Sequence, residues 1–403
     1  MKAPVGIELF AGCGGLSTGF LDAGLHVAAG FELDARAVDA YDYNHAYRGS
    51  RGYTADLSVV RGAELLRLAG LERVDFVVGG PPCQPFSIAG KRQGALDERA
   101  NLIGHFVRLV GEMQPSAFLL ENVPNLAAMA DGAILQGATN ALRLLGYNVA
   151  HRIMSAANHG VPQNRKRLIV LGRKGKDDVR FPEVSHGIPH RPIRCAADAI
   201  DDLPDAGEFG ETGIYNHEPT AHSLDMVKRL SQLKVGTRER GSFHDRLHPD
   251  RPSYTLRAGS GNFSPLRPVH YKHHRVITVR ESARLQGFSD FFIWPDRIPR
   301  LQQYRQVGNA VAPPMAAAIA RCLADQMGWP MDEVAFRGDP SVRPPANVLT
   351  DEQRKELRAS RLRGASLGKV AQADSQIASV RRKKTRRTDD GRETQRPSRK
   401  GTR

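Results

Sequence analysis

Short apolar runs alternate with longer amphipathic segments along the first 173 residues of the chain. The apolar runs have the length and side chains of buried strands, and they cover residues 6–10, 26–31, 74–78, 117–120, 147–153 and 168–172. Apolar residues at helical spacing mark residues 35–44, 99–113 and 133–145. This alternation predicts an α/β domain with a mixed, mostly parallel sheet and helices on both faces.

The alternation stops at about residue 174, where Pro, Gly, His and Asp become frequent. We therefore expect a first domain over residues 1–173 and a smaller, irregular domain over residues 174–269. Residues 270–303 are expected to form a hinge and residues 304–330 a last long helix. Residues 331–403 are expected to form a basic, disordered tail.

The composition is that of a globular protein, with 40% hydrophobic and 25% charged residues among 403. No run reaches the apolar length of a membrane-spanning helix and the N-terminus lacks a secretory pattern, so we expect a cytoplasmic protein. The four cysteines lie far apart without a Cys-x-x-Cys pair, which argues against a zinc cluster or a disulfide framework. Reduced thiols and no metal are expected.

The net charge of +15 is concentrated near the C-terminus, where residues 351–403 hold 17 Lys and Arg against 7 Asp and Glu. A basic tail is often only a solvated end of the chain. The overall charge therefore supports a nucleic-acid partner only weakly.

The first predicted strand leads into a glycine-rich turn, Ala11-Gly12-Cys13-Gly14-Gly15. Glycines there let the backbone approach a nucleoside cofactor closely. The turn lacks the Lys-Ser/Thr pair of a phosphate-binding loop, and Glu32 ends the next strand, where it could accept hydrogen bonds from ribose hydroxyls. These features fit S-adenosyl-L-methionine, which has a ribose but no phosphate. Alternatively, Glu32 only supplies negative charge to the N-terminus of the following helix.

The run at residues 74–78 ends at two glycines and two prolines, and Cys83 follows at once. Ligands of open α/β sheets bind beyond the carboxyl ends of the strands, so Cys83 would stand on a stiff loop over the ligand crevice. We interpret Cys83 as a nucleophile; the alternative is a buried, inert cysteine.

The run at residues 117–120 delivers Glu121 to the same edge of the sheet. A thiol and a carboxyl group at the ends of two strands can act on one ring, whereas a structural Glu121 would cap the next helix.

Arg165 and Arg167 share a strand face through their i, i+2 spacing. They are either surface charges or, in a cleft, groups that bind a phosphate.

The segment Pro81-Pro82-Cys83-Gln84-Pro85-Phe86-Ser87 resembles the nucleophile loop of DNA (cytosine-5) methyltransferases. Between residue 7 and about residue 320, other segments resemble the remaining motifs of the family in their usual order: Glu121-Asn122-Val123, Gln163-x-Arg165-x-Arg167, Arg251-Pro252-x-x-Thr255-Leu256, and residues 274–288 and 304–315. The resemblance implies a Rossmann-like S-adenosylmethionine-dependent methyltransferase domain plus a target-recognition domain at residues 174–269. Within the family, the sequence is similar to the enzymes of the bacterial or phage restriction–modification type.

The resemblance also implies a reaction on a cytosine flipped out of duplex DNA. Cys83 would attack C6 and Glu121 would hydrogen-bond N3 and the exocyclic amine, while Arg165 and Arg167 would bind the nucleotide phosphate and O2. Asp56 would accept a hydrogen bond from the adenine of S-adenosyl-L-methionine, unless it caps a helix. The expected cofactor-binding residues are Phe10, Gly12, Gly14, Gly15, Leu16, Glu32, Asp56, Pro81, Asn309 and Ala310.

Double-stranded DNA is the expected partner, and two regions offer polar side chains for it. Residues 88–98 would form a mobile lid whose cations meet phosphates, and loops at residues 236–245 and 257–262 could bond base edges. The expected DNA-binding residues are Gln84, Ser87, Lys91, Arg92, Arg238, Arg240, Thr255, Arg257 and Asn262.

Two other functions share part of this pattern. The related tRNA cytosine-5 methyltransferases carry a Cys-Phe-Thr tripeptide, which this sequence lacks. A non-catalytic relative would have lost Cys83 or Glu121, and both are present. We expect a monomer associated with the nucleoid, either paired with a restriction endonuclease or acting without one.

The basic tail, with its run Arg381-Arg382-Lys383-Lys384, is expected to contact DNA without sequence preference. Truncation at residue 350 should then weaken the salt-dependent part of DNA binding, measured as the slope of log affinity against log salt concentration. An unchanged slope would remove this interpretation.

Overall fold

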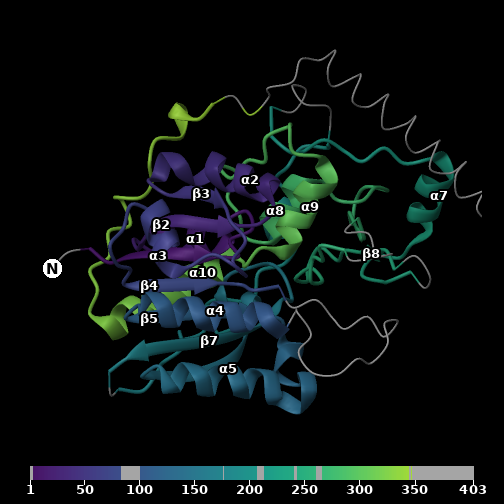
Figure 1. The fold of residues 1–403 in the computed structure, drawn as a ribbon. Coiled ribbons are helices and arrows are strands. Elements are labelled where there is room, and N and C mark those ends of the chain that lie inside the picture. Colours follow the sequence, from purple (N-terminus) through teal and green to yellow (C-terminus); the bar gives the residue numbers. More distant parts are fainter. Residues whose placement is uncertain are drawn as a thin grey trace, which may run out of the picture. The chain divides into compact units, whose positions relative to one another are not determined.

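A seven-stranded sheet forms the frame of the first half of the chain (Figure 1). The computed structural model describes residues 3–82, 100–175, 177–206, 213–239, 243–259, 266–344 and 346. The strand order is β3-β2-β1-β4-β5-β7-β6. The strands are β1 (Val5–Leu9), β2 (His26–Glu32), β3 (Arg51–Thr54), β4 (Phe76–Gly79), β5 (Ala117–Asn122), β6 (Tyr147–Ser155) and β7 (Lys166–Lys174).

Strands β1 to β5 pair in parallel, and β7 runs antiparallel to both β5 and β6. The predicted mixed, mostly parallel sheet is therefore confirmed. All six predicted strands are present with ends within two residues of the prediction, because each buried strand ends where its apolar run does.

The helices cover both faces of the sheet. They are α1 (Gly15–Asp22), α2 (Ala35–His45), α3 (Gly62–Leu68), α4 (Ala100–Met113), α5 (Ala133–Leu144), α6 (Ala197–Ile200), α7 (Leu224–Gln232), α8 (Val279–Leu285), α9 (Arg300–Asn309) and α10 (Pro313–Met327). Short 3₁₀ helices occupy Ala46–Arg48, Pro124–Ala127, Met129–Gly132, Ala156–His159 and Pro340–Val342. The three helices predicted over residues 35–145 match α2, α4 and α5 to within one residue, and α3 was not predicted.

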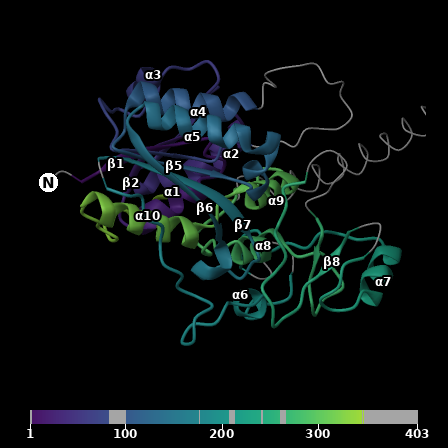
Figure 2. The same cartoon turned by 90° about the horizontal axis from the view of Figure 1, so that it is seen from below.

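Alternate residues of the central strands enter two separate cores. In β4, Phe76 and Val78 pack with residues of α1 and α10, whereas Val77 packs with α4 on the opposite face. Figure 2 shows α10 and α4 on opposite sides of the sheet. This two-sided burial explains why the central strands are apolar at consecutive positions.

The single long helix predicted for residues 304–330 is wrong, since α9 ends at Asn309 and α10 begins at Pro313. A proline lacks the N–H that a continuing helix needs and clashes with the preceding turn, but it is well suited to the first position of a new helix. By length and hydropathy alone, Arg300–Met327 could cross a membrane. However, 72% of its most apolar window is buried inside the protein, as in a core helix.

A third core joins α6, α8 and α9 to the segment that follows residue 174, with Trp294 and Phe288 among its members. Within this region β8 (Asp245–Arg246) pairs in parallel with β9 (Pro268–Val269). Thr278 and Glu281 form a capping box at the start of α8. The described residues up to Ala346 form one compact unit, and the boundaries at residues 174 and 269 stay predictions.

The disordered tail was predicted from residue 331, but residues 331–344 and 346 lie against the body of the first unit. Arg48 Nε donates to the Phe336 carbonyl at 2.6 Å, and the Phe336 ring stacks on His26 with centroids 4.9 Å apart. The Arg343 guanidinium lies 4.3 Å from the Tyr47 ring centroid. Cation–π and stacking contacts order this segment, which its polar composition did not indicate. Residues 347–403 lie outside the described residues.

Helices α1 and α10 approach closely at Gly19, where an added Cβ would lie 2.5 Å from both Ala316 Cβ and Pro313 O. Gly19→Ala should lower the free energy of unfolding by about 1–3 kcal/mol because the two helices must separate. Gly137→Ala is the matched control, since its Cβ would meet nothing within 4 Å in the exposed face of α5. Urea unfolding should find Gly137→Ala unchanged or slightly more stable; equal losses in both variants would contradict the close approach.

Candidate active site

The ends of β4 and β5 lie side by side, because the two strands pair in parallel with Gly79 opposite Leu120. An added Cβ at Gly80 would lie 3.2 Å from Glu121 Oε2, and Asn122 Nδ2 donates to the Pro81 carbonyl at 3.0 Å. The loop that carries Cys83 therefore leaves the sheet beside Glu121. Cys83 itself lies outside the described residues, as do Gln84, Ser87, Lys91 and Arg92.

Glu121 is nearly buried, and its Oε1 lies 2.7 Å from Nε of Arg167. Arg167 enters from β7, which runs antiparallel to β5. The ion pair fixes the carboxylate at the edge of the sheet and compensates its charge. Such a carboxylate can accept hydrogen bonds from an amino group placed beside the Pro81 carbonyl.

Arg165 has a different environment from Arg167, although the two were predicted to act together. Its side chain is fully buried and donates to the carbonyls of Leu256, Gly308 and Ala310 at 3.2, 3.0 and 2.9 Å. Burial lowers the pKa of Arg165 well below its ordinary value, and Arg167 adds to this effect. Because segments distant in sequence cover it, Arg165 has no surface here to offer a nucleotide.

Glu32 organises the glycine-rich turn. Its carboxylate accepts from the backbone N–H of Gly12 at 3.0 Å, and from those of Leu33 and Asp34 at 2.8 and 3.0 Å. The N-cap of α2 is Asp34, which accepts from Arg36 N. Glu32 is thus held between the turn and the start of α2, where a ribose could replace or share these bonds; that contact stays a prediction.

Open space borders the glycine-rich turn at Gly12, which has φ +55°, and where an added Cβ would meet nothing within 4 Å. Phe10 also adopts a left-handed backbone, with φ 55°. By contrast, a Cβ at Gly14 would lie 2.4 Å from the His45 ring, so Gly14 is required by packing. The side chain of Leu16 is buried in the core, so only its backbone could face a ligand.

The linker between α9 and α10 lies against the same turn. A Cβ at Gly15 would lie 2.3 Å from the Val311 carbonyl and 3.1 Å from Ala310 Cβ. Asn309 is exposed at the end of α9. The structure therefore brings Asn309 and Ala310 to the turn that was predicted to hold the cofactor.

Asp56 accepts from the backbone N–H and the hydroxyl of Ser58, at 2.9 and 2.6 Å. These hydrogen bonds lower the pKa of Asp56. Asp56 caps the turn at residues 57–59, since the N–H groups of Val59 and Val60 donate to its carbonyl, whereas the N-cap of α3 is Arg61. Its proposed contact with adenine is not tested.

Of the expected DNA-binding residues that the structure describes, Thr255 and Arg257 lie on one segment and Arg238 lies beside β8. Thr255 donates its hydroxyl to the Asn164 carbonyl, and Arg257 is exposed. Arg238 pairs with Asp245. Arg240 and Asn262 lie outside the described residues.

A buried polar network that sequence reasoning missed lies beneath the turn. Glu8 Oε2 accepts from the backbone N–H of Ser17 at 2.8 Å and from its hydroxyl. The Ser17 hydroxyl also lies 2.8 Å from the Tyr41 hydroxyl, which lies 2.7 Å from the Ser50 hydroxyl. The signal was a single carboxylate inside an apolar strand, which needs a polar partner once buried.

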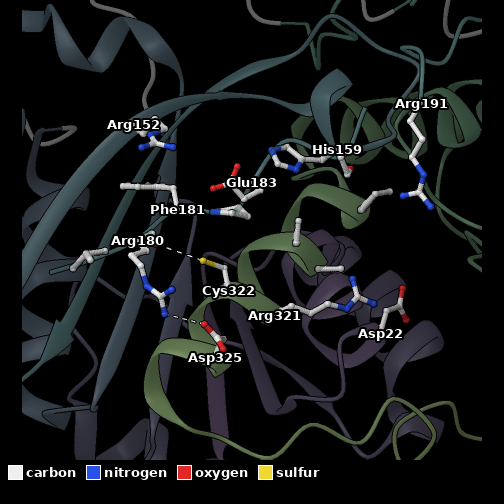
Figure 3. A pocket seen from close by; sticks show the side chains of 16 residues that line it. Asp22, Arg152, His159, Arg180, Phe181, Glu183, Arg191, Arg321, Cys322 and Asp325 are labelled. Carbon is white, nitrogen blue, oxygen red and sulfur yellow. Dashed lines mark hydrogen bonds and ion pairs between the residues drawn. The ribbon is translucent and has the colours of Figure 1, made fainter. Parts of the chain in front are cut away.

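A cavity of about 1000 Å³ lies elsewhere, between α10 and residues 179–191 (Figure 3). Its lining includes Arg180, Phe181 and Cys322 but none of the predicted site residues. Among the described residues no group of three His, Cys, Asp or Glu side chains could hold a metal ion. The predicted site residues that the structure describes therefore lie away from this cavity.

The sequence and the fold were compared with known proteins. A family model described as C-5 cytosine-specific DNA methylase matches residues 5–325. The chain is 36% identical to the Type II methyltransferase M1.HphI of Haemophilus parahaemolyticus, over 79% of this chain and 86% of that protein. It is 34% identical to the Type II methyltransferase M.XorII of Xanthomonas oryzae, over 79% and 84%.

Two solved structures share the fold. A DNA modification methyltransferase encoded within an E. coli prophage superposes with a TM-score of 0.67 and 29% identity, over 81% of this chain and all of that one. The Dnmt2 methyltransferase of S. pombe superposes with a TM-score of 0.60 over the same shares, and at 18% identity it shows the fold alone.

Burial raises the pKa of Glu8 to about 8, against the opposing effect of its hydrogen bonds with Ser17. Between the ordinary value of 4.5 and about 8, the folded state keeps a proton that the unfolded state has lost. The free energy of unfolding should therefore fall as pH rises through this window, by up to about 1.4 kcal/mol per pH unit.

Glu8→Gln should remove this part of the pH dependence, measured by urea unfolding at pH 5, 6, 7 and 8. Glu72→Gln, at an exposed position, should leave it in place. Equal pH slopes for the wild type and Glu8→Gln would show that Glu8 does not hold the proton.

Proposed function

This chain belongs to the C-5 cytosine-specific DNA methylase family, and from that membership we propose how its own residues perform the reaction. It is a DNA (cytosine-5) methyltransferase that uses S-adenosyl-L-methionine as methyl donor. The proposed reaction proceeds on a cytosine flipped out of a specific duplex site, through a covalent bond between Cys83 and C6. The observation that carries the proposal is the contact of Gly80 and Pro81 with Glu121 and Asn122.

The residues around the glycine-rich turn fit the methyl donor. The open space at Gly12 admits a nucleoside close to the backbone, and Glu32 offers carboxylate oxygens at its border. Asn309 and Ala310 would close the pocket from the α9–α10 linker. When bound, S-adenosyl-L-methionine supplies an electrophilic methyl group.

The target base must leave the helix because its C5 and C6 cannot be reached by a covalent catalyst within the stack. The Cys83 thiolate adds to C6 while Glu121 gives a proton to N3 and accepts a hydrogen bond from the exocyclic amine, so that electron density leaves the ring as the carbon–sulfur bond forms. C5 then takes the methyl group. Loss of the C5 proton restores the double bond and releases Cys83.

The two arginines of the Gln163-x-Arg165-x-Arg167 segment take separate roles in this proposal. Arg167 orients Glu121 through their 2.7 Å ion pair and can reach the pyrimidine O2 beside it. Arg165 binds the carbonyls of Leu256, Gly308 and Ala310 and so joins the strand to the segments that complete the site. We therefore reassign Arg165 from nucleotide binding to a structural role.

The biological setting is proposed from the relatives, of which M1.HphI and M.XorII are named Type II methyltransferases. We propose a cytoplasmic, nucleoid-associated monomer that is either the modification enzyme of a restriction–modification system or an orphan relative. The tRNA cytosine-5 methyltransferase is the alternative. An assay on duplex DNA and tRNA in parallel separates the two.

Bisulfite sequencing of DNA from cells that express the protein should show cytosine methylation at one short sequence.

Cys83→Ala should abolish methyl transfer while DNA and cofactor binding persist, because the thiol supplies the covalent step. Glu121→Gln should lower the rate by about 10²- to 10⁴-fold, the usual contribution of a positioned acid or base. Full activity of Cys83→Ala would refute the assignment of the nucleophile.

A further inference from the structure

Arg238 is an exposed arginine held by a buried carboxylate. Its Nε and Nη2 both donate to the carboxylate of Asp245, with Nη2 3.1 Å from Oδ2. The Arg238 side chain is 46% exposed, whereas that of Asp245 is 9% exposed. This side-on pair leaves the opposite edge of the guanidinium, formed by Nη1 and the second Nη2 hydrogen, directed away from Asp245.

The Tyr254 ring makes a second contact with the guanidinium. The Arg238 Cζ lies 5.6 Å from the ring centroid of Tyr254, and the Tyr254 hydroxyl donates to the Gly236 carbonyl at 3.0 Å. Arg238 therefore has a preset orientation, which reduces the conformational entropy it would lose on binding a ligand.

Structural arginine pairs in the same region are turned inward. Arg275 also makes a bidentate pair, with Glu281, but the two side chains are only 12% and 1% exposed. Arg246 is buried and donates to the carbonyls of Leu230 and Tyr271. Arg238 differs because Asp245 holds one edge of its guanidinium while the other donor edge lies at the surface.

The segment that carries Tyr254 is tied to the chain just before β7. Ser253 and Thr255, on either side of Tyr254, both bond to Asn164: its N–H donates to the Ser253 carbonyl at 2.8 Å, and its carbonyl accepts from the Thr255 hydroxyl. Three residues further along, Arg167 meets Glu121. In Figure 1, α9 lies between the sheet and β8.

Positive charge surrounds the same surface. The Arg267 guanidinium lies 5.3 Å from the ring centroid of Phe243, which is 42% exposed. Arg257 follows Tyr254 three residues later in the chain and is exposed. Arginines beside a base-reading group contact phosphates and hold the duplex in register. The surface thus combines a preset fork of donors with charges that suit a DNA backbone.

We propose that Arg238, positioned by Asp245 and Tyr254, donates two hydrogen bonds to O6 and N7 of one guanine in the major groove of the recognition site. The inference rests on the proposed function, since it names a base that the enzyme reads. Only guanine presents two adjacent acceptors there; adenine and cytosine present an amino donor, and thymine offers one acceptor beside a methyl group. The recognition sequence accordingly contains a guanine whose identity depends on this side chain.

The test separates base reading from methyl transfer. Full-length wild type, Arg238→Ala and Arg238→Lys each select duplexes by binding from a randomised library. We expect the wild type to select a sequence with an invariant guanine at which both variants lose their preference, while other positions are kept. Affinity for the selected site should fall by about 5- to 150-fold, the range for one bidentate contact. Arg238→Lys keeps the charge but lacks the fork, so its salt dependence should stay close to that of the wild type.

Replacing the guanine by 7-deazaguanine, which lacks the N7 acceptor, should weaken binding by the wild type but not by Arg238→Ala. The control is Arg180→Ala, which breaks an exposed Arg–Asp pair with Asp325 on α10 and should select the wild-type sequence. Thermal unfolding confirms that each variant is folded, and Arg238→Lys serves if Arg238→Ala is not.

Three results would overturn the inference: no guanine in the wild-type sequence, the same sequence for wild type and variants, or a uniform loss of affinity with the sequence retained. Methylation by the wild type is scored separately by bisulfite sequencing. A protein that binds its guanine but transfers no methyl group would contradict the proposed function and leave the reading of guanine supported.

Discussion

The parallel pairing of β4 with β5 is the constraint on which the site depends. Because Gly79 lies opposite Leu120, the residues that follow them, Gly80 and Glu121, reach the same edge together. The hydrogen bond from Asn122 to the Pro81 carbonyl then ties the start of the nucleophile loop to the strand that carries the acid. A slip of one residue would turn Glu121 to the other face and separate it from the loop.

Buried charge holds the separate segments of the site in place. The Arg165 guanidinium satisfies three carbonyls, two of which, Gly308 and Ala310, are at the C-terminal end of α9, where carbonyls lack helical partners and a cation is favoured. Its third acceptor, Leu256, belongs to the segment that also carries Thr255. Removing this side chain would take one donor from each of these three carbonyls, and the Ala310 carbonyl would keep Nε2 of Gln286. The cost of unpaired buried carbonyls explains why an arginine lies in the interior.

Three arginines show how environment assigns function to one residue type. Arg165 is fully buried and structural, Arg167 is nearly buried and paired with Glu121, and Arg238 is half exposed on a buried carboxylate. Burial determines which donor edge each one can offer to a ligand. An arginine with one edge held and the other exposed, as at Arg238, is suited to the base reading that we propose.

The sequence by itself determined the α/β class, the ends of the strands and the family, because apolar runs, glycines and prolines act through local sterics and burial. It also indicated Cys83 and Glu121 as partners, since ends of parallel strands meet at one edge. Only the tertiary structure decided that Arg165 is interior, that Glu8 needs Ser17 and that Arg238 rests on Asp245. Spacing along a strand reports the face on which a side chain lies, but what covers that face comes from segments about 90 to 145 residues away in the chain.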